Sequence, residues 1–150
     1  MNEKSAGLFR LLDTDTNDLV DALEFLASAA LLSGMPTRDK LEFILNAYDF
    51  DGSQELSIDE VTLAMKSTLT GLCKMSRDRM PREEELEVKA VHCFESVLGP
   101  GESGKAYIGR VIEWAAYDPE VKSWVDYFDD APERDWQVYP MQRHELDFGK

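Results

Sequence analysis

The 150-residue chain carries 30 acidic residues against 16 basic ones, a formal net charge of −14, and 43% of its residues are apolar. This balance excludes nucleic acids and anionic membrane surfaces as default partners, because polyanions attract basic patches. The apolar fraction suffices for a core, so a disordered chain is also excluded, and the length suits one domain or two small lobes.

Apolar residues at helical spacing predict four helices in the first half, over residues 5–12, 23–32, 37–48 and 57–75. Thr37 is the expected N-cap of the third helix. Ser57 and Glu60 have the spacing of a capping box, which predicts the start of the fourth helix. The first half is therefore expected to consist of two helix–loop–helix units within residues 1–75.

Residues 76–81 are expected to form a linker, and residues 82–128 a second helical lobe. Pro81 fits the first turn of a long helix that carries Leu86 to Val97. Two further helices are expected, one around Trp114 and a last one opened by Asp118 and Pro119. The acidic tail, residues 129–150, gives no clear prediction.

The acidic excess is concentrated in two segments, residues 13–24 and 49–60. Each holds five acidic side chains and no basic one, so together they contribute −10 of the net charge. Two compact, similarly spaced carboxylate clusters indicate a specific role rather than a general solubility coat.

Both segments have the ligand spacing of a calcium-binding loop. Ca²⁺ takes six to eight oxygen ligands, and a twelve-residue loop can supply them from side chains at positions 1, 3, 5, 9 and 12 and a carbonyl at position 7. In the first loop these ligands are Asp13, Asp15, Asn17, the Leu19 carbonyl, Asp21 and Glu24. In the second loop they are Asp49, Asp51, Ser53, the Glu55 carbonyl, Ser57 and Glu60.

With an apolar residue at position 8 of each loop, Val20 and Leu56, the segment from about residue 5 to residue 75 resembles an EF-hand pair of the calmodulin superfamily. The resemblance implies an all-α fold in which Val20 and Leu56 form a short strand pairing between the two loops. It also implies two Ca²⁺ sites, with Mg²⁺ as a possible competitor.

Both loops depart from the family pattern at position 6, where a glycine with positive φ is usual and Asp18 and Gln54 stand instead. The strain is on the order of 1 kcal/mol. The first loop offers four carboxylates and the second three. We therefore expect the first site to bind Ca²⁺ more tightly than the second.

The segment from Phe94 to Trp114 resembles a degenerate third repeat, with Ile108 in the position-8 role. Its Gly-rich loop is too long and lacks carboxylate ligands, so no Ca²⁺ is expected there. Residues 99–105 (GPGESGK) also match part of a phosphate-binding loop, but Ala106 replaces the Mg²⁺-binding Ser or Thr. Nucleotide binding is therefore not expected.

Other classes of function find little support in the sequence. The N-terminus lacks the apolar run of a signal peptide, and no apolar stretch is long enough to insert into a bilayer. Cys73 and Cys93 are expected as free thiols in a reducing cytoplasm, a location that leaves cytoskeletal association open. His92 and His144 have no catalytic partner at useful spacing, so an enzyme is not expected.

The leading interpretation is a Ca²⁺ sensor or regulatory subunit that changes helix orientation and modulates a protein partner, for example an amphipathic helix or a larger assembly. Two alternatives stay open at this point. A Ca²⁺ buffer would bind the ion with little change of shape. A scaffolding domain with the same fold would bind its partner without Ca²⁺.

Overall fold

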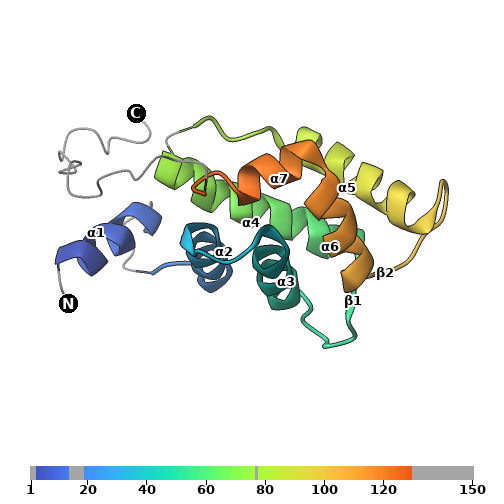
Figure 1. Ribbon diagram of the computed structural model, residues 1–150, viewed down its shortest axis with the longest axis horizontal. Coiled ribbons are helices and arrows are strands. Elements are labelled where there is room, and N and C mark those ends of the chain that lie inside the picture. The colour runs from blue at the N-terminus through green and yellow to red at the C-terminus, as the bar shows by residue number, and fades with distance from the viewer. Residues whose placement is uncertain (1–2, 14–18, 77, 130–150) are drawn as a thin grey trace.

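The computed structural model describes residues 3–13, 19–76 and 78–129, and Figure 1 shows an assembly of helices with one short sheet. The helices are α1 (Glu3–Leu12), α2 (Ala22–Leu32), α3 (Thr37–Ala47), α4 (Ile58–Ser76), α5 (Glu83–Leu98), α6 (Ile108–Tyr117) and α7 (Pro119–Val125). The strands are β1 (Glu55–Leu56) and β2 (Ala106–Tyr107). The predicted all-α class, with a two-stranded bridge between loops, is confirmed. In this part of the chain no helix is both long and apolar enough to span a membrane.

The strand pairing differs from the expected one. Leu56 of β1 lies opposite Ala106 of β2 in an antiparallel register, and not opposite Val20. Ile108, expected in the position-8 role, instead begins α6, and its backbone N–H donates to the Gln54 carbonyl at 3.0 Å. The second loop is therefore paired with the third, Gly-rich loop. An apolar residue at position 8 indicates that a loop takes part in a strand pairing, but it does not identify the partner.

At the starts of the helices, one predicted cap is confirmed and two other predictions are wrong. Ser57 and Glu60 form the predicted capping box, with reciprocal hydrogen bonds of 2.7 and 3.2 Å. Thr37 is the first residue of α3 rather than its N-cap, since its hydroxyl donates to Asp126 Oδ1 at 2.6 Å. α5 begins two residues after Pro81, because Arg82 and Glu85 cap it reciprocally.

One large hydrophobic core joins the helices from α2 to α7. Its most buried members include Ala27, Tyr48, Leu56, Val61, Cys93, Ala106 and Val111. Trp114 and Trp124 pack against this core, which extends across the expected boundary between residues 1–75 and 82–128. The division into two lobes thus stays a prediction, while the apolar packing is shared between its two sides.

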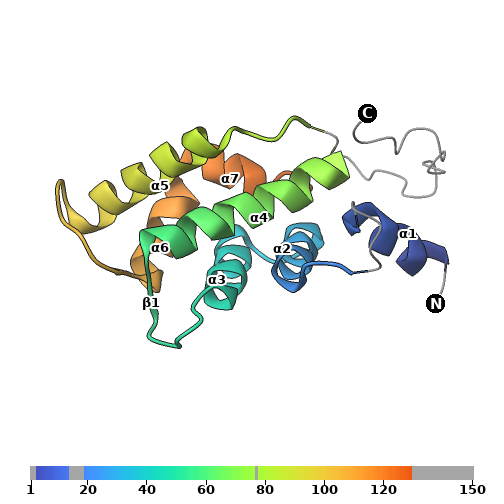
Figure 2. The ribbon, with the colours of Figure 1, turned by 180° about the vertical axis from the view of Figure 1, so that it is seen from behind.

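Helix α4 is the longest element and runs along the long axis, crossing α2 and α3 (Figure 2). The crossing with α2 is close at Gly71, where an added Cβ would lie 2.2 Å from the Ser28 hydroxyl oxygen. A side chain at this position would displace the Ser28 hydroxyl, and the glycine lets the two helices lie close together.

A fully buried lysine fastens α7 to the first half of the chain. Lys40 has no exposed surface, and its ammonium donates to the Leu31 carbonyl at 3.3 Å, the Val125 carbonyl at 3.4 Å and Asp129 Oδ1 at 2.7 Å. Burying an ammonium is costly unless it is paired and hydrogen-bonded, and this set of acceptors meets that requirement.

We expect Lys40→Met to lower the free energy of unfolding by about 1–3 kcal/mol, because the methionine fills the space but leaves the two carbonyls and Asp129 without their donor. Urea unfolding followed by circular dichroism measures this change. Lys66→Met is the matched control, since Lys66 forms an exposed ion pair with Glu83 and should change stability by less than about 1 kcal/mol. Equal effects of the two substitutions would contradict the assignment of Lys40.

The two cysteines are free thiols in different environments. Burial, reinforced by the negative charge of Asp118, raises the pKa of the Cys93 thiol to about 12. Burial also raises the pKa of the half-exposed Cys73, with a smaller part from Asp78. Only the thiolate reacts with alkylating reagents, so reactivity rises as pH approaches the pKa.

At pH 8 we expect iodoacetamide to modify Cys73 in the folded protein and to leave Cys93 unmodified until urea unfolds the chain. A thiol of pKa about 12 is ionised to roughly one part in ten thousand at that pH. Peptide mass spectrometry after timed labelling gives the two rates. Faster labelling of Cys93 than of Cys73 would be inconsistent with the described core.

Candidate metal centre

The backbone of the second loop, residues 49–60, makes the sharp turn that a calcium-binding loop requires. Gly52 and Gln54 have φ values of 68° and 63°, and Gln54 is the single non-glycine residue with positive φ among the described residues. Its backbone N–H donates to Asp49 Oδ2 at 2.9 Å, and this bond helps to hold the strained conformation. Position 6 thus adopts the usual conformation despite its unusual residue.

Two expected ligand carboxylates meet inside this turn. The Ser53 backbone N–H donates both to Asp49 Oδ1 at 3.1 Å and to Asp51 Oδ1 at 3.0 Å. A single donor shared by two carboxylate oxygens places those oxygens side by side. The side chains at positions 1 and 3 of the loop therefore face the same point.

The other expected ligands of the loop are oxygen atoms arranged along the following segment. Ser53 Oγ donates to the Glu55 carbonyl at 3.1 Å, which joins positions 5 and 7. Ser57 and Glu60 are held together by the capping box at the start of α4. The capping bond directs the Glu60 carboxylate to the Ser57 backbone N–H.

The donor set of this loop fits a hard divalent cation. It consists only of carboxylate, hydroxyl and carbonyl oxygens, the ligands that Ca²⁺ prefers, on a backbone that turns as such loops turn. Within the described ranges no three His, Cys, Asp or Glu side chains converge as a metal cluster. The reason is visible at Glu60, which caps α4, and at Asp51, which forms an ion pair.

The ion-pair partner of Asp51 is Lys105 from the third loop. The Lys105 ammonium lies 2.7 Å from Asp51 Oδ2, and both side chains are exposed. This hydrogen bond, followed by those from Ser53, holds the pKa of the Asp51 carboxyl well below its usual range. The same bond raises the pKa of Lys105, and the charges of Asp51, Glu60 and Asp49 add to the effect.

The first loop is described only at its two ends. Asp13 is buried, and the Leu19 side chain is 71% exposed. Asp21 is the N-cap of α2, where its Oδ1 accepts a 2.8 Å hydrogen bond from the Glu24 backbone N–H. The expected ligands Asp15 and Asn17 lie outside the described residues.

Glu24, the expected position-12 ligand of the first loop, is paired with a lysine from α4. The Lys74 ammonium forms an ion pair with Glu24 Oε1 and donates to the Leu12 carbonyl at 3.0 Å. The Glu24 side chain is 14% exposed and the Lys74 side chain 15% exposed. Lys74 therefore connects the end of α1, the start of α2 and the last turns of α4.

The Gly-rich third loop, residues 99–105, does not form a phosphate-binding site of the strand–loop–helix type. Its strand, β2, follows the loop instead of preceding it, and Lys105 is engaged by Asp51. Three glycines with positive φ, namely Gly99, Gly101 and Gly104, shape the segment. Its observed contact is with the second loop.

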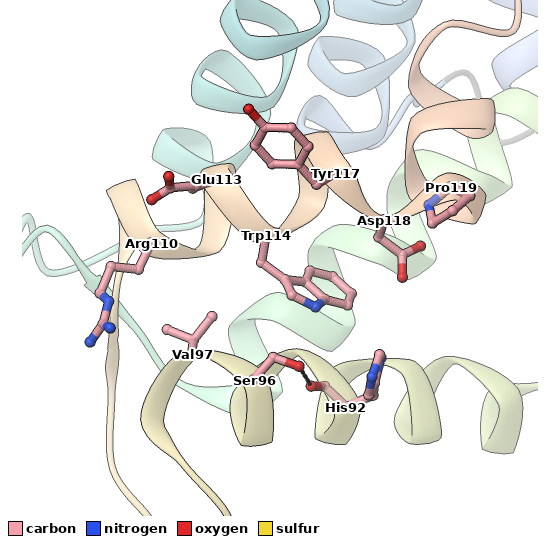
Figure 3. Close-up of a pocket in the computed structure, with 9 residues that line it drawn as sticks. All are labelled: His92, Ser96, Val97, Arg110, Glu113, Trp114, Tyr117, Asp118 and Pro119. Atoms are coloured by element: carbon pink, nitrogen blue, oxygen red, sulfur yellow. Dashed lines mark hydrogen bonds between the residues drawn. The ribbon is translucent and has the colours of Figure 1, made fainter.

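A hollow of about 470 Å³ lies between α5 and α6 (Figure 3). The Trp114 ring points towards α5 and meets His92 edge-on at 5.8 Å between ring centroids. The Ser96 hydroxyl donates to the His92 backbone carbonyl at 2.8 Å rather than to a ring nitrogen. Asp118 accepts from two backbone N–H groups as the cap of α7. This geometry contains no activated nucleophile.

Two lysines that contact the expected ligands, Lys74 and Lys105, are not predicted by the sequence pattern. Lys105 enters that pattern only as the last residue of the partial phosphate-loop match at residues 99–105. Their partners are 50 and 54 residues away, so spacing along the chain carries no signal for either pair.

We expect Lys74→Met to expose α1 to proteolysis, because it removes the hydrogen bond from α4 to the Leu12 carbonyl at the end of α1. Trypsin cleavage after Arg10, followed by mass spectrometry in the presence of EDTA, should become about fivefold faster, the factor that loss of about 1 kcal/mol in local stability produces. Lys66→Met serves as the control and should leave this rate unchanged. An unchanged rate in Lys74→Met would show that α1 is held by other contacts.

No family model matches the chain. It is 39% identical to calcium-binding protein J of Dictyostelium discoideum over 54 residues, which are 36% of this chain and 28% of the relative. Calcium-binding protein K of the same organism gives the same identity over the same length. Visinin of Gallus gallus is 23% identical over 120 residues, 80% of this chain and 62% of the relative.

The chain therefore spans less than two thirds of each of these relatives. Two of them carry calcium binding in their names, and a recoverin family protein of Dictyostelium discoideum also matches, at 36% identity over 55 residues. The resemblance to EF-hand calcium-binding proteins, first indicated by the two acidic loops, is confirmed by these similarities.

Proposed function

We propose that the chain is a calcium sensor that binds Ca²⁺ in the loops at residues 13–24 and 49–60 and regulates a protein partner. The observation that carries the proposal is the second loop, where Asp49 and Asp51 accept from the same Ser53 N–H inside a turn with positive φ at Gly52 and Gln54. The ion would be held by Asp49, Asp51, Ser53, the Glu55 carbonyl, Ser57 and Glu60. The ion would supply a positive charge that offsets the negative charge of these oxygens.

A route from the loops to the rest of the molecule supports a sensor over a passive binder. Glu60 lies in the first turn of α4, and Lys74 near its other end pairs with Glu24 of the first loop. α4 packs against α1, α2, α3 and α5. A change in the contacts of either glutamate therefore acts on a helix that packs against four others.

Exposed apolar side chains support a protein partner. Phe25, Phe43 and Leu63, on three of the helices, are each more than 40% exposed. Apolar side chains of this kind are the groups that an amphipathic helix contacts. We propose such a helix as the partner.

A calcium titration against a Mg²⁺ background tests the proposed function. We expect Trp fluorescence and apolar-dye binding to change together, since Trp114 and Trp124 pack on the core that α4 shares. Heat of binding without either signal would favour a buffer. No heat and no signal would contradict calcium binding and leave a scaffolding domain.

Glu24→Gln and Glu60→Gln assign the two sites in the same calorimetric titration. Each substitution removes one carboxylate at position 12 and should weaken its own site by tenfold or more. The first loop is expected to be the tighter site, with four carboxylates against three. A strong site that disappears in Glu60→Gln and persists in Glu24→Gln would reverse this order.

A further inference from the structure

Lys105 is placed against the second loop by the strand pairing. It immediately precedes Ala106, the β2 residue opposite Leu56 in the register. The positive φ of 126° at Gly104 turns the chain just before it. The position of the Lys105 backbone is therefore set by the same hydrogen bonds that hold the second loop.

The Lys105 ammonium contacts a carboxylate that is expected to bind the calcium ion. The ammonium contacts Asp51 Oδ2 at 2.7 Å, while Asp51 Oδ1 accepts the Ser53 N–H on the inner side of the turn. Asp49 and Glu60, two further expected ligands, are near enough to affect the pKa of Lys105. The direct contact of Lys105 in the second loop is with Asp51, and the charges of Asp49 and Glu60 add to it.

We propose that Lys105 is an internal competitor for calcium in the loop at residues 49–60 and so sets the affinity of that site. This inference rests on the proposed function, because it concerns the same loop. The ammonium occupies an oxygen of Asp51 and repels an arriving divalent cation. Calcium binding therefore requires the lysine to move away from Asp51, and the third loop acts as a modulator of its neighbour.

The exposure of the pair makes this exchange possible. The Lys105 side chain is 36% exposed and the Asp51 side chain 54% exposed. Exposed ion pairs contribute little to folding stability, so removing the lysine changes the charge of the loop more than it changes the fold.

Lys105→Gln tests the proposal. In a calcium titration of the full chain, NMR signals of the Gly52 and Gln54 backbone amides report on this loop alone. We expect the dissociation constant measured there to fall roughly threefold to tenfold in Lys105→Gln, because one exposed opposing charge is removed. The ratio between wild type and variant should shrink towards one as KCl is raised, since salt screens the interaction.

Two further variants separate competition from other effects. Lys105→Arg keeps the charge and should retain an affinity close to that of the wild type. Lys66→Gln removes one positive charge from the exposed Lys66–Glu83 pair, away from the loop, and should leave the loop's affinity unchanged. Thermal melting without calcium should give the same midpoint for all three variants within a few degrees.

The outcomes distinguish this inference from the proposed function. Binding of equal strength in wild type and Lys105→Gln would overturn the role of Lys105 while leaving calcium binding intact. An equal gain in Lys66→Gln would also overturn it, by pointing to net charge alone. Absence of loop signals with calcium in every variant would instead contradict the proposed function at this loop.

Discussion

The backbone pairing between β1 and β2 is the constraint on which the rest of the arrangement depends. Extended residues carry N–H and C=O groups that need partners, and in the second loop Glu55 and Leu56 find them at Tyr107 and Ala106. Leu56 and Ala106 are both fully buried, so the bridge is also part of the core. It joins the helix–loop–helix unit of α3 and α4 to that of α5 and α6.

The sequence was informative about each unit and uninformative about how the units associate. Apolar spacing located the helices, and the Ser57–Glu60 capping box was predicted correctly because caps depend on neighbours along the chain. The predicted partner of Leu56 was wrong, because an apolar residue at position 8 is compatible with strand pairing to any other loop of the same kind. The family resemblance implied Val20 as the partner, whereas the structure pairs Leu56 with Ala106.

The candidate site shows the same limit. The spacing of Asp49, Asp51 and Ser53 predicts ligands of one ion, and in the structure Asp49 and Asp51 accept from the same Ser53 N–H. The lysines that oppose the carboxylates could not be predicted, because an ammonium on a long side chain can reach partners on elements far away in sequence. Counting charges along the chain assigns Lys74 and Lys105 to a neutral background, whereas in three dimensions each pairs with one carboxylate of an acidic loop.

The buried ammonium of Lys40 has a consequence for where a stable unit of this chain can end. Its strongest partner, Asp129, lies beyond the last residue of α7, and two of its three acceptors belong to the segment from Val125 to Asp129. A chain that ends at Phe128 still contains Val125, Tyr127 and Phe128, which pack in the core, yet it loses the counter-charge of a side chain that solvent does not reach. A residue that adds nothing to the apolar core can therefore still be required for stability, through the charge that it supplies to a buried partner.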